Sequence, residues 1–284
     1  MNTYNYILSK QIQWARNSGI ELVGSKGKRG RLAYTKTLEE NLFEPLSSET
    51  TTSIREGDGG ELAGNPSKMQ AVHSSSALGV NIFQYWQSIN HPEKVAHACR
   101  LCQKTTKISK SIRFEAKYPI DTRFRMGPNI DVVIENEPSA KYKVFAIECK
   151  FTEAYGGRGH SGMKEKYLDL DIWKEIPHLH KLAVSISPED NGNEYLHCAQ
   201  LIKHILGLKK AFGKTNFRLL YLWYDTLGYA GWKHREETES FAEVAKSDGI
   251  AVSRMSYQEL IVWMAENYRD SYPKYIEYIT NRYL

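Results

Sequence analysis

Hydrophobic and polar residues alternate in short runs through the middle of the chain, and these runs predict β-strands. Residues 112–118 alternate as a half-exposed strand does, whereas residues 130–135 and 141–151 are rich in β-branched and aromatic side chains. A short polar link joins the last two runs, as in a hairpin. A buried strand is expected at residues 217–224 and a short one at 250–253. The first three strands therefore form an antiparallel three-strand meander.

Apolar residues at helical spacing predict helices on both sides of these strands. Helices are expected at residues 4–18, 37–43, 77–86, 163–181 (interrupted at Pro177), 194–212, 236–246, 256–267 and 273–283. Residues 47–65 are polar and glycine-rich, which is typical of a loop. The expected fold class is α/β (α+β), with a central mixed β-sheet flanked by helices.

The composition is that of an ordinary globular protein, because 41% of the 284 residues are hydrophobic and 25% are charged. No apolar run approaches the ~20 residues of a membrane span. The N-terminus lacks the cationic start and apolar core of a signal peptide. We therefore expect a cytoplasmic protein with no membrane partner.

The four cysteines do not form the pattern of a disulfide framework or of a zinc site. Cys99 and Cys102 make a CxxC pair with His97 just upstream, but the other two cysteines lie far along the chain. A structural zinc ion needs four ligands, usually supplied as two such pairs. We assign no metal to this motif.

The net charge of +5 is compatible with a polyanionic partner but does not identify one. Four cations lie within six residues between Lys26 and Arg31, namely Lys26, Lys28, Arg29 and Arg31. Such a segment can wrap a phosphate backbone through the release of counterions. A solvated loop explains the same composition equally well.

Two charged residues interrupt the apolar strand predicted at residues 141–151. Successive strand side chains point to opposite faces, so Glu148 and Lys150 share one face and Cys149 points to the other, into the core. An unpaired charge in a buried strand costs several kcal/mol to desolvate. Two such charges on one face therefore indicate a functional site.

A carboxylate on the preceding strand gives these charges a chemical meaning. Asp131 begins that strand, and antiparallel pairing across the hairpin can bring it beside Glu148. Two neighbouring carboxylates favour a shared hard cation such as Mg²⁺. Waters and phosphate oxygens would complete the coordination shell of that cation. Lys150 can then stabilise the nucleophile or the charge that develops on a phosphate. The combination suits phosphodiester hydrolysis.

Asp131 followed by Glu148-Cys149-Lys150 on adjacent apolar strands resembles the motif of the PD-(D/E)XK nuclease superfamily, which has the restriction endonuclease-like fold. The order of a helix, three strands, a helix and a strand between Ser74 and Tyr224 is similar to the core of that superfamily. The chain departs from the motif in one respect, because residues 128–130 place the proline three residues before Asp131.

The resemblance implies a Mg²⁺-dependent DNA endonuclease of the restriction type, in which Mn²⁺ can substitute. Its substrate would be double-stranded DNA, and Asp131, Glu148 and Lys150 would be catalytic, with the two acids binding the metal. It also implies a single nuclease domain over residues 1–284. Residues 1–73 would form a helical, loop-rich elaboration, 74–255 the nuclease core and 256–284 C-terminal helices. Cleavage of both strands at a palindromic site would suit a homodimer.

A second Glu-x-Lys pair, Glu115 and Lys117, tests how specific the spacing is. No acidic residue lies on a strand before it, and its flanking residues Arg113 and Tyr118 suit a strand edge that faces solvent. An ion pair is unremarkable at such an edge. We therefore assign the motif to Glu148 and Lys150 alone.

Further candidates for the site are less tightly defined, and each has a simple structural explanation. The additional active-site candidates are Glu61, Glu153 and Gln200. The candidates for DNA contact, besides the four basic residues above, are Ser75, Arg158 and Lys164. Exposed loop acids, a helix cap and a solvated face account for these residues without any function.

Other functions are compatible with the same sequence features. A repair, recombination or phage-derived nuclease of the same fold would use the same residues. A catalytically inactive nucleic-acid-binding module would keep the fold, with Glu148 and Lys150 paired to each other. A glycosidase built on two carboxylates is disfavoured, because it has no use for the lysine.

Overall fold

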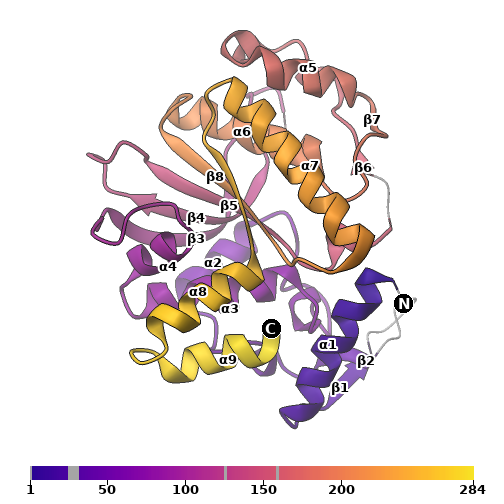
Figure 1. Ribbon diagram of the computed structural model, residues 1–284, viewed down its shortest axis with the longest axis vertical. Coiled ribbons are helices and arrows are strands. Elements are labelled where there is room, and N and C mark those ends of the chain that lie inside the picture. The colour runs from indigo at the N-terminus through magenta and orange to yellow at the C-terminus, as the bar shows by residue number, and fades with distance from the viewer. Residues whose placement is uncertain (1, 25–31, 125–126, 158–159) are drawn as a thin grey trace.

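The chain is organised around a five-stranded mixed sheet (Figure 1). A computed structural model describes residues 2–24, 32–124, 127–157 and 160–284. The strand order is β3-β4-β5-β8-β9. The strands span Ser109–Lys117 (β3), Asn129–Asn136 (β4), Val144–Lys150 (β5), Phe217–Trp223 (β8) and Val252–Ser256 (β9). β3, β4 and β5 pair antiparallel in succession, whereas β5, β8 and β9 run parallel.

Helices cover both faces of this sheet. The helices are α1 (Thr3–Asn17), α2 (Ser48–Glu56), α3 (Ser75–Ser88), α4 (Pro92–Ala98), α5 (Pro177–Ser185), α6 (Cys198–Phe212), α7 (Gly228–Ser247), α8 (Tyr257–Tyr268) and α9 (Pro273–Tyr283). One core joins the sheet to α3, α4, α8 and α9, and a second core joins its other face to α5, α6 and α7 (Figure 1). The arrangement confirms a mixed α/β fold.

Short elements complete the described chain. The minor strands are β1 (Leu22–Gly24), β2 (Leu32–Thr35), β6 (His160–Ser161) and β7 (Glu189–Asp190). The 3₁₀ turns are η1 (Glu39–Asn41), η2 (Lys68–Gln70), η3 (Glu153–Tyr155), η4 (Glu165–Tyr167) and η5 (Asp171–Glu175). Among the described residues, no helix is long and apolar enough to cross a membrane.

Strand β5 is buried on both faces, which explains its nearly continuous apolar sequence. Ile147 and Cys149 belong to the core that contains α3, whereas Ala146 belongs to the core that contains α6. The alternation of the strand thus confirms that Cys149 points into the core, away from Glu148.

Three local predictions were wrong. Residues 47–65 contain a helix, α2, which begins at its N-cap Ser47 and buries only Thr50 and Ile54. Its sequence is too polar for the helical period to stand out. The helix predicted over 163–181 was wrong before its expected interruption at Pro177, because two 3₁₀ turns occupy that part and α5 begins at Pro177. The predicted helix at 37–43 is only the 3₁₀ turn η1.

One glycine allows α6 to approach the sheet closely. A Cβ atom at Gly207 would lie 2.4 Å from the carbonyl oxygen of Tyr118, far inside van der Waals contact. Glycine at this position lets the helix lie against the chain that leaves β3. The side chains on the inner face of α6 therefore reach strand β5.

The chain ends meet around one buried arginine. Arg282 of α9 is 2% exposed, and its guanidinium lies 3.9 Å from the ring centroid of Trp14 in α1. It donates hydrogen bonds to the backbone oxygen of Asn41 at 2.8 Å and to the hydroxyl of Tyr278 at 2.6 Å. The helices at the two ends of the chain are thereby fixed to each other.

Candidate active site

Three carboxylates occupy one row across three neighbouring strands. The register of β3 and β4 puts Glu115 opposite Asp131. The pairing of β4 with β5 reaches Val132 and Ile147, so Asp131 and Glu148 are the next residues, where the two strands separate. The two predicted metal ligands are therefore neighbours across adjacent strands.

Asp131 is held in place by the backbone of the neighbouring strand. Its Oδ2 accepts a hydrogen bond from the backbone N–H of Cys149 at 2.7 Å. Burial, together with the nearby negative charge of Glu148, raises the pKa of Asp131 well above its ordinary value. The negative charges of Asp131 and Glu148 are thus close enough to disfavour each other, as expected of two carboxylates that share a cation.

Glu148 is fully buried between two cationic or hydrogen-donating groups. Its Oε1 lies 2.5 Å from Nζ of Lys150, and its Oε2 lies 2.8 Å from Nε2 of His204 on α6. Burial alone would raise the pKa of Glu148, but Lys150 and His204 outweigh it and lower the pKa to about 2. Glu148 therefore carries its negative charge at neutral pH.

Lys150 is a buried cation surrounded by acids. Burial disfavours its charge, but Glu148, Asp131 and Glu153 together raise the pKa of Lys150 above its ordinary value. A protonated ammonium can donate hydrogen bonds and stabilise negative charge, but it cannot accept a proton. Its chemistry is therefore electrostatic.

The expectation that Glu115 faces solvent at a strand edge was wrong. Glu115 has a φ of 50°, which is uncommon for any residue except glycine, and it is only partly exposed. Asn129 donates a hydrogen bond to its Oε2 at 3.3 Å, whereas Lys117 pairs with Asp58 at 2.9 Å instead. Burial, together with Glu61 and Glu148, raises the pKa of Glu115 to about 7. Glu115 thus adds a third carboxylate to the site.

The other predicted acids lie close to this row. Glu61 follows α2 and is near enough to raise the pKa of Glu115, while Lys68 lies 3.8 Å from its carboxylate. Glu153 opens η3, directly after β5, and its charge acts on Lys150. The structure therefore brings both acids toward the predicted site.

Gln200, the predicted candidate on α6, lies one helical turn before His204, the residue of α6 that contacts Glu148. Gln200 is half-buried on α6, and its side chain makes no hydrogen bond to any residue that the structure describes. His204, four residues later, contacts Glu148. Sequence reasoning missed His204, although the i+4 spacing from Gln200 put both on one face of the helix.

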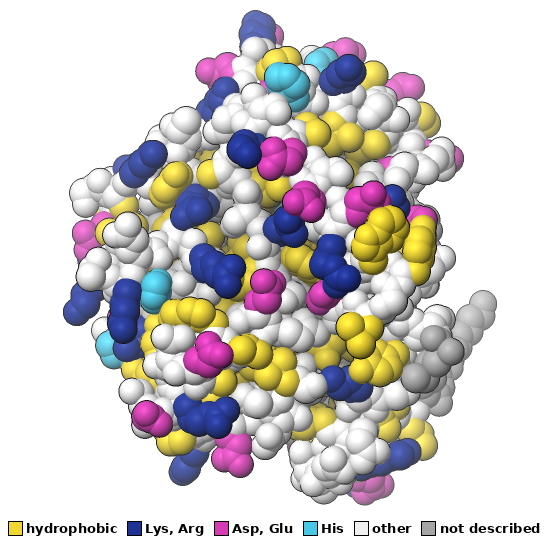
Figure 2. Space-filling model, viewed as in Figure 1, with side chains coloured by type: hydrophobic (Ala, Val, Ile, Leu, Met, Phe, Trp, Pro, Cys, Tyr) yellow, Lys and Arg dark blue, Asp and Glu magenta, His cyan; other side chains and the backbone are white. Residues whose placement is uncertain are grey.

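The predicted DNA-contacting residues fall into two groups. Lys26, Lys28, Arg29, Arg31 and Arg158 lie outside the described residues. Ser75 opens α3 and lines the same small cavity as Glu115 and Asp131. Lys164 is exposed, and its charge adds to burial in lowering the pKa of Lys203 on α6. Elsewhere cations and carboxylates intermingle, as the face in Figure 2 shows.

The donor set suits a hard divalent cation. Carboxylate oxygens from Asp131, Glu148 and Glu115 are the ligands that Mg²⁺ prefers, and one or two of them suffice when waters fill the shell. A cavity of about 10 Å³, roughly the room for one water, lies between Glu115, Asp131 and α3. Within the described chain, no three His, Cys, Asp or Glu side chains are already arranged around one point. The residues present therefore fit a cation that also takes ligands from water or substrate.

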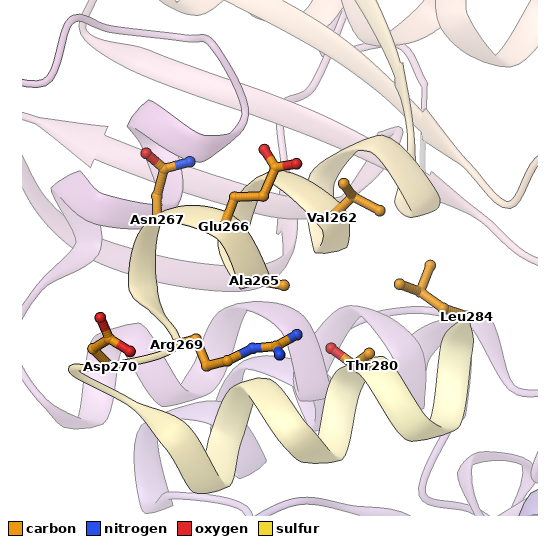
Figure 3. Close-up of a pocket in the computed structure, with 8 residues that line it drawn as sticks. All are labelled: Val262, Ala265, Glu266, Asn267, Arg269, Asp270, Thr280 and Leu284. Atoms are coloured by element: carbon orange, nitrogen blue, oxygen red, sulfur yellow. The ribbon is translucent and has the colours of Figure 1, made fainter.

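A larger surface groove of about 490 Å³ lies away from these carboxylates. It runs between α8 and α9, where Arg269 extends along the groove toward Thr280 (Figure 3). None of the predicted catalytic residues lines it. The groove is therefore separate from the predicted site at the sheet.

The amino-acid sequence also matches a known family. A family model described as "Restriction Endonuclease associating with ARP" matches residues 8–284, nearly the whole chain. No curated protein and no solved structure matches the chain.

Proposed function

The chain belongs to the family of restriction endonucleases associating with ARP, and on that premise we propose that it is a Mg²⁺-dependent DNA endonuclease of the restriction type. The family description supports a nuclease that acts on DNA. The order α3, three antiparallel strands, α6 and β8 supports a restriction endonuclease-like fold of the PD-(D/E)XK superfamily.

One observation carries the proposal for the site. Asp131 and Glu148 are neighbours on adjacent strands, and Lys150 lies 2.5 Å from Glu148 in a largely buried position. Burying such charges is costly unless they are used, since apolar residues of similar size would serve the sheet equally well. The presence of all three charges in a buried part of the sheet therefore supports a catalytic role.

Each residue has a distinct part in the proposed hydrolysis of the phosphodiester bond. Asp131 and Glu148 would hold Mg²⁺, which when bound polarises a phosphate oxygen and favours ionisation of water. The N–H of Cys149 keeps the Asp131 carboxylate in place. Lys150, as a cation, would orient the attacking water and stabilise the negative charge that develops on the phosphate.

A non-catalytic nucleic-acid-binding module is the second candidate, and one observation favours it. Glu148 and Lys150 do contact each other, as they would in an inactive relative that keeps the pair for stability. A repair, recombination or phage-derived nuclease would share the proposed chemistry, but the family description favours restriction. Cleavage assays separate the active from the inactive case.

The decisive experiment incubates the full chain with mixed genomic DNA and Mg²⁺, or Mn²⁺, and sequences the fragment ends. We expect double-strand cleavage at a defined sequence, and a homodimer by light scattering. Asp131→Asn and Lys150→Ala should each reduce cleavage by roughly 10³-fold or more, about 4 kcal/mol of transition-state stabilisation. Lys110→Ala is the matched control, since Lys110 lies on β3 but pairs with Glu137 at 2.7 Å. Full activity in Asp131→Asn would refute the assignment.

A further inference from the structure

A histidine that lies beneath the carboxylate row has a single polar contact. His204 is 1% exposed, and its Nε2 lies 2.8 Å from Oε2 of Glu148. Neither ring nitrogen makes a well-formed hydrogen bond with the residues that the structure describes, so this close contact with Glu148 is the polar contact that the imidazole has there. We propose that His204 is a positioning residue, which fixes the orientation of the Glu148 carboxylate for metal binding. This inference rests on the proposed function.

The burial of His204 is hard to explain by packing alone. A buried polar group without a compensating contact costs free energy, and a leucine would fill similar space without that cost. The structure offers an internal comparison in His234 of α7, which is fully buried. Its two ring nitrogens lie 3.1 Å from the hydroxyl of Tyr155 and 2.9 Å from that of Tyr221. His234 is thus satisfied by neutral partners, whereas His204 depends on Glu148.

The contacts of Glu148 divide its two oxygens between two partners. Lys150, on the same strand, contacts Oε1 of Glu148. His204, on the helix that covers the sheet, contacts Oε2. An ionised carboxylate has about four lone-pair sites, so both oxygens keep capacity for a further ligand. Close contacts at both oxygens limit the rotation of the carboxylate, so that its remaining lone pairs keep one main direction.

The backbone of α6 makes this contact possible. Gly207 permits the helix to approach the carbonyl of Tyr118, and His204 lies one turn before it, with its side chain toward β5. The imidazole is anchored in a rigid helix inside the core, which contains Ile205 and Leu201 of the same helix. A rigid support is what a carboxylate ligand needs from the groups behind it, since such outer contacts typically change metal affinity or activity by roughly 10- to 100-fold.

The test measures binding of Mn²⁺ to the full chain by electron paramagnetic resonance, without DNA, and then the Mg²⁺ dependence of DNA cleavage. His204→Leu removes the contact, and we expect its Kd for Mn²⁺ to rise roughly 10- to 100-fold. The Mg²⁺ concentration for half-maximal cleavage should rise in parallel. His204→Gln keeps a polar N–H group that can contact Glu148, and its Kd for Mn²⁺ should stay within a few-fold of that of the unchanged protein.

Two further variants keep the outcome decisive. His234→Leu is the matched control, because it removes an equally buried imidazole that does not contact Glu148, and its Mn²⁺ affinity should be unchanged. If His204→Leu does not fold, His204→Asn replaces it, since its shorter amide does not reach Glu148 and should lose the affinity that His204→Gln keeps. Equal affinity of the asparagine and glutamine variants would then refute the positioning role.

The same measurements separate failure of this inference from failure of the proposed function. If the unchanged protein binds Mn²⁺ and cleaves DNA, and folded His204→Leu does both equally well, the positioning role is refuted and the nuclease stands. If the unchanged protein neither binds Mn²⁺ nor cleaves any DNA, the metal-dependent nuclease is refuted, and the role of His204 falls with it.

Discussion

The protein buries charged side chains in two places, and the groups that surround them differ in kind. Among the residues that the structure describes, the guanidinium of Arg282 contacts neutral groups, including oxygens of Asn41 and Tyr278, and it stacks on Trp14. Around Glu148, the partners are charged or ionisable, namely Lys150 and His204. The first arrangement satisfies the donors of one cation, whereas the second leaves acceptors with spare capacity.

The difference indicates what each cluster is for. Neutral hydrogen bonds from α1, η1 and α9 hold segments that are far apart in the sequence, so the Arg282 cluster serves architecture. The Glu148 cluster joins β5 to α6, which the hydrophobic core already packs against the sheet, and its carboxylate oxygens lack well-formed hydrogen bonds. A buried charge that contributes little to the architecture is a candidate for chemistry.

The largest effect on stability should follow from loss of the architectural charge. Arg282→Met leaves several buried acceptors without a donor, so the free energy of unfolding should fall by about 3–5 kcal/mol. Chemical denaturation followed by circular dichroism measures this change. Arg113→Met is the control, because Arg113 is half-exposed, pairs with Glu135 and should cost less than about 1 kcal/mol. Similar losses in both variants would contradict the architectural role.

Removing Glu148 alone should destabilise the protein more than removing Glu148 and Lys150 together. Glu148→Gln removes the counter-charge that lies 2.5 Å from the ammonium of Lys150 and should lower the free energy of unfolding by about 3 kcal/mol. The double variant Glu148→Gln with Lys150→Met removes both charges and should recover to within about 1 kcal/mol of the unchanged protein. Chemical denaturation of the single and double variants gives the coupling energy between Glu148 and Lys150.

DNA cleavage by the same variants distinguishes a catalytic pair from a structural one. Neither the single nor the double variant should cleave DNA in Mg²⁺, although the double variant is stable. A double variant that is as unstable as Glu148→Gln alone would show that the pair stabilises the fold, as Arg282 does.

The sequence was informative where periodicity alone defines a feature. The strands at 112–118, 130–135 and 141–151 were each found within a few residues of their true ends, because alternation and β-branched composition mark a buried sheet. The neighbouring positions of Asp131 and Glu148 followed from the short link between their strands. These features depend on contacts that are local in the sequence.

Features that depend on tertiary context could not be predicted in the same way. Glu115 joins the row because its backbone has a positive φ, which no residue spacing encodes. His204 reaches Glu148 because α6 covers that particular face of the sheet, and the sequence does not state which face a helix covers. The Arg282 cluster joins both chain ends, far apart in sequence. Each case needs the three-dimensional arrangement first.

Glu115 offers a test of intermediate size that depends on pH. Its pKa of about 7 lies above the ordinary value of an unfolded chain, so the folded protein binds a proton more tightly there. The stability that this proton provides is fully present below the unfolded pKa and is lost as the pH rises through about 7. Because Glu115→Gln removes the charge, it should be more stable than the unchanged protein by about 1–2 kcal/mol at about pH 8.

The stability difference between the two proteins should shrink as the pH is lowered to about 5. Thermal denaturation of both proteins in the absence of divalent cations, at several pH values, measures it. A difference that does not change with pH would mean that Glu115 is an ordinary exposed carboxylate, as its sequence context first indicated.

The smallest effect should come from the residue between the two site charges. The Cys149 side chain is 2% exposed and packs toward α3, where its sulfur would lie 3.8 Å from a Cβ at Gly79. Cys149→Ala should therefore lower the free energy of unfolding by about 1–2 kcal/mol, through a small cavity in the core. The backbone N–H that holds Asp131 is unchanged in alanine, so DNA cleavage should stay near that of the unchanged protein. Loss of cleavage in a folded Cys149→Ala variant would mean that the thiol itself takes part, and that the two faces of β5 are not divided between chemistry and packing.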